Sequence, residues 1–164
     1  IYEGGHHVPF LVKWPGVVGA GGKSDALISQ IDLMATFADL VGYELDDATA
    51  EDSHNLLPLL KGESDKSPRA SHIHNTHADR WAIREGDFVL VVGKDGYHSG
   101  RNKAWEEARN YPADDKGEVE LYNLREDIGQ AKNLAGTMPE KVAELEALLE
   151  KLREQGHSAP RLAN

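Results

Sequence analysis

The sequence predicts an α+β fold in which a strand–loop–helix piece is followed by a small antiparallel sheet packed against a long C-terminal helix. Two short apolar runs at 81–83 and 88–92 flank Arg84-Glu85-Gly86-Asp87, a connection typical of a β-hairpin. Residues 142–152 carry Val and Leu at helical spacing, and Gly156 follows them as a stop signal. Elements with one apolar side must bury it, so we expect the hairpin and this helix to share one core.

The N-terminal piece opens with a short apolar segment. Val8 to Trp14 is mostly apolar and bounded by Gly and Pro, which predicts a buried strand of a parallel sheet. A glycine-rich loop follows, and Ser29 is the predicted N-cap of a helix that ends at Gly42. In the later run Leu56-Leu57-Pro58-Leu59-Leu60, the proline argues against a long helix.

The second half supplies the remaining strands and the helix start. Ile73 and the run 119–124 predict two further short strands. Thr137-Met138-Pro139-Glu140 has the spacing of a capping box, with proline in the first turn. We therefore expect two parts: residues 1–62 as the end of an α/β domain, and residues 63–164 as a small α+β subdomain.

Composition excludes several classes of function. The 164 residues carry 18 basic and 28 acidic side chains, a net charge of −10, which repels nucleic acid. Any site for an anion must therefore be formed by a local group of basic side chains. The absence of cysteine excludes disulfides, thiolate metal sites and a thiol nucleophile. No apolar run approaches the ~20 residues that a membrane-spanning helix needs, so we expect no membrane partner.

Three of the eight histidines lie close together in the sequence. On a strand, His72 and His74 project to one face, a spacing that metal sites use, and His77 with Asp79 would complete a ligand set. A second interpretation places His74 and His77 beside Arg80 in a pocket for an anionic ligand. A third leaves them as ordinary surface histidines. The sequence favours this third interpretation, and of the other two it favours an anion pocket over a metal site.

Two more histidines follow a pair of glycines near the start of the chain. Gly4 and Gly5 permit backbone conformations and close approaches that other residues do not. His6 and His7 are therefore candidates for the rim of a site, and a plain turn between two elements is the alternative.

Six groups of short motifs follow one another over residues 1–158. They are Tyr2-Glu3-Gly4-Gly5; Val8-Pro9-Phe10 with Trp14-Pro15-Gly16; Ser29-Gln30-Ile31-Asp32-Leu33; Leu56-Leu57-Pro58-Leu59-Leu60-Lys61-Gly62; Ala82-Ile83-Arg84-Glu85-Gly86-Asp87; and Leu121-Tyr122-Asn123-Leu124 with Pro139-Glu140. Each is weak alone. In this order they resemble the C-terminal part of sulfatases, bacterial arylsulfatase-like enzymes in particular.

The resemblance implies an enzyme of the alkaline-phosphatase-like superfamily that cleaves sulfate esters with calcium and a formylglycine made from Cys or Ser. Residues 1–62 would end its catalytic domain, and residues 63–164 would form a C-terminal subdomain that shapes the substrate pocket. On this basis the candidate substrate-binding residues are His6, His7, His74, His77 and Arg80, and His74 takes the place of a family histidine. The resemblance also implies a periplasmic or secreted full-length protein.

The chain departs from the family pattern at the catalytic positions. It has no Cys and no Ser-x-Pro-Ser-Arg sequence, and the family's metal-ligand segment and active-site lysine would precede Tyr2. We therefore assign no catalytic residue, metal ligand or cofactor to this chain. It should have no sulfatase activity alone, because hydrolysis needs a positioned nucleophile and a metal. Sulfate-ester substrate would bind through the full-length enzyme.

Two other readings stay open. One is a phosphodiesterase or phosphonate hydrolase of the same superfamily, which differs in residues that precede Tyr2. The other is a non-catalytic binding module that acts alone. In a chain separated from the rest of a catalytic domain, the apolar segment 8–14 would be an exposed strand edge, which favours association of two copies.

Overall fold

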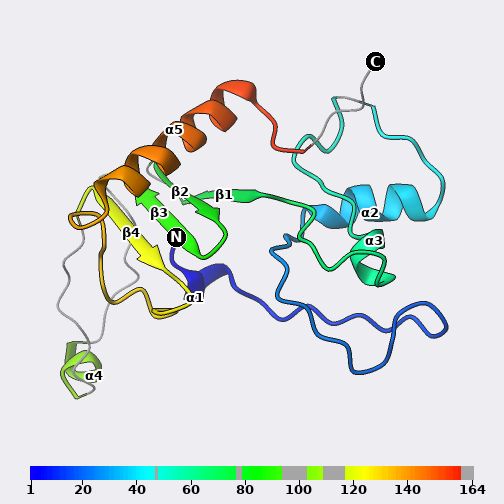
Figure 1. Ribbon diagram of the computed structural model, residues 1–164, viewed down its shortest axis with the longest axis horizontal. Helices are drawn as coiled ribbons and strands as arrows, with labels where there is room; N and C mark the ends of the chain where they lie inside the picture. Colours follow the sequence, from blue (N-terminus) through cyan, green and yellow to red (C-terminus); the bar gives the residue numbers. More distant parts are fainter. Residues whose placement is uncertain (47, 77–78, 94–102, 109–116, 160–164) are drawn as a thin grey trace. The chain divides into compact units, whose positions relative to one another are not determined.

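The computed structural model describes the chain except for residues 47, 77–78, 94–102, 109–116 and 160–164 (Figure 1). The chain divides into two compact units. The sheet unit comprises Ile1–Val8 and Ile73–Glu150, and the helical unit comprises Pro9–His72 and Lys151–Asn164. This division differs from a single boundary after residue 62, because the first eight residues join the sheet unit, where Ile1 packs on the core.

The predicted small antiparallel sheet is confirmed. It has four strands in the order β1-β2-β3-β4, and the pairs β2–β3 and β3–β4 are antiparallel. The strands are β1 (Ser71–Thr76), β2 (Arg80–Glu85), β3 (Phe88–Val92) and β4 (Val119–Asn123). The predicted hairpin joins β2 to β3, where Glu85 pairs with Phe88 across a tight turn. Gly86 has a φ of +56° in that turn, a conformation that glycine adopts without steric cost.

One face of the sheet is covered by the predicted C-terminal helix, α5 (Pro139–Gln155; Figure 1). Lys141 of α5 reaches Glu85 at 3.1 Å and lies 5.5 Å from the ring centre of Phe88. Strand residues alternate between faces, so the fully buried side chains on this same face are those of Ile83, Leu90 and Leu121. Gly156 follows the helix with a φ of +73°, as the stop signal predicted.

The opposite face of the sheet carries the start of the chain. Ala82, Val89, Val91 and Leu124 form a buried cluster there, and Ile1 packs against it. The short helix α1 (Glu3–His6) follows directly. The segment before α1 is therefore part of the core of the sheet unit. A further short helix, α4 (Lys103–Glu107), lies in the long connection between β3 and β4.

The helical unit contains α2 (Asp32–Leu40) and α3 (Leu57–Leu60). The first confirms the helix predicted to end at Gly42, although it begins at Asp32 and its N-cap residue makes no side-chain capping bond. The second confirms that the helix around Pro58 is short. No helix among the described residues is long and apolar enough to cross a membrane.

The predicted buried strand from Val8 to Trp14 is wrong for this structure. The segment forms no strand, and Leu11 is 89% exposed. A strand needs a neighbouring chain for its backbone hydrogen bonds, and no described strand pairs with this segment. Apolar composition alone was therefore insufficient to predict the conformation.

Candidate functional site

The first candidate site is built around Glu3, at the start of α1. Its side chain is almost fully buried, and three basic groups surround the carboxylate. His6 Nε2 lies 3.4 Å away, His7 Nδ1 3.3 Å and Arg84 Nη1 3.2 Å. The hydrogen bond from His6 lowers the pKa of Glu3 below its ordinary value, burial opposes this shift, and the Arg84 charge adds to it. The site therefore holds an ionised carboxylate.

Two histidines that lie far apart in the sequence meet beside this carboxylate. The rings of His6 and His74 have centres 4.1 Å apart and planes tilted by 44°. His74 Nε2 is 2.9 Å from the carbonyl oxygen of Ile1, and His6 Nδ1 is 3.0 Å from that of Tyr2. Burial lowers the pKa of His74, although its hydrogen bond to Ile1 raises it in part. His74 is therefore neutral near pH 7, which lets it lie against a second imidazole.

A buried polar cluster lies next to the histidine pair. Glu120 on β4 accepts hydrogen bonds from the hydroxyls of Tyr2, at 3.0 Å, and Tyr122, at 2.7 Å. Arg80 on β2 forms an ion pair with the same carboxylate and donates to the Tyr2 hydroxyl at 3.3 Å. Burial, followed by the hydrogen bond to Glu120, raises the pKa of Tyr122 above its ordinary value. The cluster thus joins the start of the chain to two strands.

The structure brings together part of the predicted pocket. His6 and His74 are in ring contact, and His7 is joined to them through Glu3. Arg80 is only 3% exposed, and its charge is shared with a buried carboxylate. His77 lies outside the described residues.

Sequence reasoning missed the acidic residues of the site. Glu3 stands in the Tyr-Glu-Gly-Gly motif, in which only the glycine pair and the histidines after it were predicted to lie at a site. Glu120 lies between Val119 and Leu121, on the face of β4 opposite to Leu121. A charged residue inside a predicted strand is the one signal that could have identified it.

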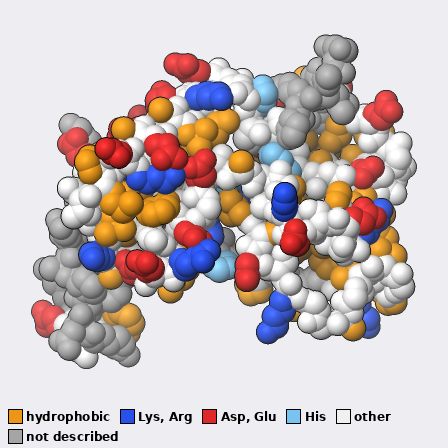
Figure 2. Space-filling model, viewed as in Figure 1, with side chains coloured by type: hydrophobic (Ala, Val, Ile, Leu, Met, Phe, Trp, Pro, Cys, Tyr) orange, Lys and Arg blue, Asp and Glu red, His pale blue; other side chains and the backbone are white. Residues whose placement is uncertain are grey.

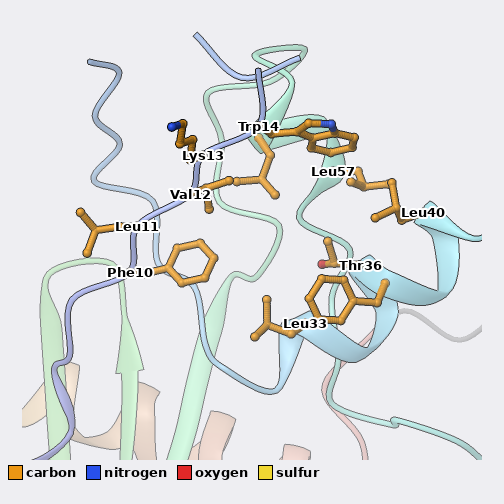
Figure 3. Close-up of a pocket in the computed structure, with 11 residues that line it drawn as sticks. Phe10, Leu11, Val12, Lys13, Trp14, Leu33, Thr36, Leu40 and Leu57 are labelled. Carbon is orange, nitrogen blue, oxygen red and sulfur yellow. The ribbon is translucent and has the colours of Figure 1, made fainter. Parts of the chain in front are cut away.

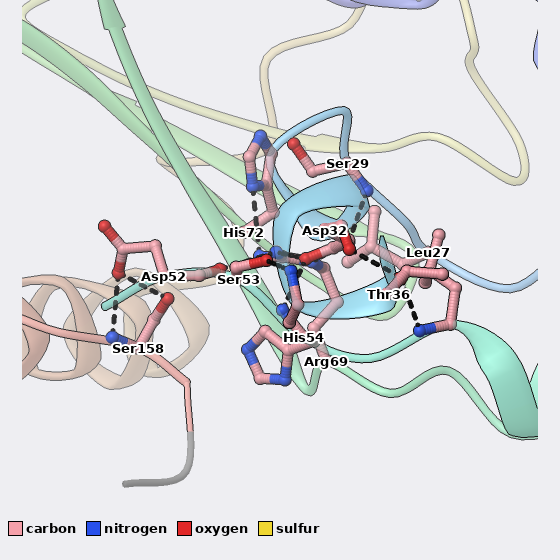
Figure 4. Close-up of polar contacts among 12 residues, drawn as sticks. Leu27, Ser29, Asp32, Thr36, Asp52, Ser53, His54, Arg69, His72 and Ser158 are labelled. Atoms are coloured by element: carbon pink, nitrogen blue, oxygen red, sulfur yellow. Dashed lines mark hydrogen bonds and ion pairs between the residues drawn. The ribbon is translucent and has the colours of Figure 1, made fainter. Parts of the chain in front are cut away.

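The helical unit holds a second buried polar network (Figure 4). Asp32 forms an ion pair with Arg69, and its carboxylate also accepts from the backbone N–H groups of Ser29, at 2.7 Å, and His54, at 2.9 Å. Thr36 accepts from the Leu56 backbone N–H at 2.9 Å. These contacts tie α2 to the chain around residues 53–56 and 69. We interpret this network as structural, since every described carboxylate and guanidinium group in it is bound within the fold.

The helical unit also contains an apolar pocket of about 360 Å³ (Figure 3). Phe10 and Leu33 point into it, from the extended segment and from α2. The remaining lining is almost entirely apolar, so the pocket suits hydrophobic groups and not a sulfate. On the face drawn in Figure 2, Lys and Arg side chains lie among Asp and Glu side chains.

The described residues do not form a metal centre. No group of three or more His, Asp or Glu side chains among them could hold a metal ion. The alternative set of His72, His74, His77 and Asp79 includes one residue outside the described part of the chain. Accordingly, none of the described side chains is assigned to the calcium ion that the resemblance implies.

Comparisons with known proteins identify the family. Residues 1–87 match the family described as N-sulphoglucosamine sulphohydrolase, C-terminal. The N-acetylgalactosamine-6-O-sulfatase of Bacteroides thetaiotaomicron is 32% identical over 93% of this chain and 28% of its own length. Human arylsulfatase A is 33% identical over 90% of this chain and 30% of its own length.

Solved structures agree with these relatives. A structure described under the metabolism of multiple glycosaminoglycans by Bacteroides thetaiotaomicron superposes with a TM-score of 0.69. It is 29% identical, and the match covers 89% of this chain and 29% of that one. This chain thus spans less than a third of the length of the relatives it matches. The chain belongs to the sulfatase family and corresponds to the C-terminal region of its members.

Proposed function

We propose that the full-length protein containing this chain hydrolyses sulfate esters, and that this chain contributes substrate-pocket and structural elements. The observation that carries the proposal is the ring contact between His6 and His74, held beside the buried Glu3 in a chain of the sulfatase family. A protonated imidazole donates to sulfate oxygens, and the unprotonated nitrogen of a neutral imidazole accepts from sugar hydroxyls. We assign His6, His7 and His74 to substrate contacts on this basis.

The other two predicted residues take different parts in the proposal. Arg80 contributes to the pocket from within the sheet, where its guanidinium group is bound to the buried carboxylate of Glu120. His77 stays a sequence-based candidate. We further propose that residues 1–62 end the catalytic domain, and that the calcium ligands and the formylglycine are supplied by the rest of the full-length protein. A periplasmic or secreted location belongs to the same proposal.

The test is kinetic and uses the full-length protein. Its turnover is measured on N-acetylgalactosamine 6-sulfate, on a nitrophenyl sulfate and on a bis-nitrophenyl phosphate. Preferred hydrolysis of either sulfate ester supports the proposal. Preferred hydrolysis of the phosphodiester would instead place the protein with the phosphodiesterases of the superfamily and overturn it.

The contribution of this chain is tested with His6→Ala and His74→Ala in the same protein. Loss of a hydrogen bond to a charged group costs about 1.5–3 kcal/mol, so KM should rise about tenfold or more for each variant. The matched control is His157→Ala, which removes a histidine of the helical unit and should leave KM unchanged. If these variants fold and keep the original KM, the proposal that the histidines contact substrate is refuted.

A further inference from the structure

Glu120 is a fully buried carboxylate on the sheet face that carries the apolar cluster of Ala82, Val89 and Val91. Its cross-strand partner on that face is Val91, which belongs to the hydrophobic cluster beneath Ile1. A buried carboxylate is unfavourable unless charges and hydrogen bonds compensate it. Arg80, Tyr2 and Tyr122 all direct polar groups to this one side chain. The position of Tyr2 is therefore specified by hydrogen bonds, which are directional, as well as by packing.

A second contact fixes the next residue. The backbone N–H of Glu3 donates to Gln130 Oε1 at 2.6 Å. Gln130 is buried and has a φ of +51°, a region that non-glycine residues rarely occupy. The turn that holds it is closed by a hydrogen bond from the Gln130 N–H to the Asp127 carbonyl at 3.0 Å. Such a conformation persists only where the surroundings impose it, and here it directs the Gln130 side chain to the chain start.

These two anchors lie immediately before the histidine pair. The single turn of α1 is closed by hydrogen bonds from the Gly5 N–H to Tyr2 and from the His7 N–H to Glu3, each at 2.9 Å. His6 therefore moves with Tyr2 and Glu3 as one short rigid piece. The other member of the pair, His74, comes from β1 and contacts the carbonyl of Ile1 at 2.9 Å.

We infer that Glu120 and Gln130 are positioning residues that, through Tyr2 and Glu3, set the ring of His6 against that of His74. A buried ion pair contributes little to stability compared with apolar side chains of the same volume, whereas it can specify a unique arrangement. The polar cluster therefore fixes the position of the histidine pair. Its consequence for substrate recognition rests on the proposed function.

The first experiment measures placement in the 164-residue chain. Tyr2→Phe removes the hydroxyl that joins Tyr2 to Glu120 and keeps the ring. We expect the nuclear Overhauser contact between the two imidazoles to weaken or vanish. The Gly5 and His7 amides should exchange at least about tenfold faster, as expected for loss of one hydrogen bond to a charged group. Amides of the β2–β3 pair should change less than about twofold, since their ladder is untouched.

The control for this experiment is Tyr43→Phe, at an exposed tyrosine of the helical unit. It should change neither readout. The inference is overturned if Tyr2→Phe leaves the imidazole contact and the α1 amides as they were. It is equally overturned if amides of α1 and of β2–β3 accelerate together, because that result shows general destabilisation and not placement.

A second pair of variants tests the other anchor. Gln130→Ala removes the oxygen that accepts from Glu3, and Gln130→Glu retains an acceptor at the same reach. Faster exchange at α1 in the first variant, with recovery in the second, supports the inference. Equal exchange in both variants contradicts a role for the Gln130 oxygen.

The full-length protein separates this inference from the proposed function. If both hold, Tyr2→Phe raises KM about tenfold and changes kcat less, because the ring that binds substrate is displaced while the chemical groups remain. If the imidazole contact is lost and KM does not change, the substrate role of the histidines is refuted and the positioning role stands.

Discussion

The buried ion pair of the helical unit offers the sharpest test of how this fold is held together. Asp32 and Arg69 are both almost completely excluded from water, and the Asp32 carboxylate accepts four hydrogen bonds, from Ser29, from His54 and twice from Arg69. Replacing Arg69 by Met leaves this carboxylate buried without its counter-charge. Breaking a buried pair in this way costs about 3–5 kcal/mol, against a typical total stability of about 5–15 kcal/mol.

Unfolding in urea is monitored by hydrogen exchange of the α2 amides. These amides report the stability of the helical unit separately. Arg69→Met and Asp32→Asn should each lower the free energy of unfolding by about 3–5 kcal/mol, and the double variant should cost much less than their sum. The control is Arg125→Met, which removes an exposed ion pair with Asp87 (2.8 Å; side chains 76% and 41% exposed). It should cost less than about 1 kcal/mol. Single variants that match this control, or additive losses in the double variant, would refute the reasoning.

Three further predictions concern packing, pH and activity. Leu149→Ala should destabilise the sheet unit by about 2–5 kcal/mol, whereas the exposed Glu146→Ala should change it by less than about 0.5 kcal/mol; urea midpoints compare them. Burial, helped by the Arg69 charge, lowers the pKa of His54 below 6.5, so the helical unit should lose stability as the pH falls below 6.5 through the lower folded pKa. His54→Gln should flatten that loss between about pH 7 and 5, and an unchanged slope would exclude His54 as its source. Finally, the 164-residue chain alone should not hydrolyse a nitrophenyl sulfate, and turnover by the pure chain would contradict the assignment of catalysis to the rest of the protein.

The elements that sequence reasoning placed correctly are those whose signals are local. The hairpin at Gly86 and the helix that stops before Gly156 are specified by residues within a few positions of each other. The order of the sulfatase motifs likewise depends only on the linear sequence, and the family assignment was confirmed. The segment from Val8 to Trp14 failed because its conformation depends on a neighbouring strand, which its own residues do not encode.

The candidate site likewise has residues that the sequence indicated and contacts that only the structure showed. The sequence alone drew attention to His6 and His74, because histidines beside a glycine pair and on a predicted strand are chemically conspicuous. Only the tertiary structure decided that these rings touch and that Tyr2 is bound to Glu120, 118 positions away in the chain. The physical reason is that a carboxylate in a strand is exposed or buried depending on which other segments of the chain pack over it. Here two tyrosines and an arginine cover it, and that cover fixes where the chain start lies.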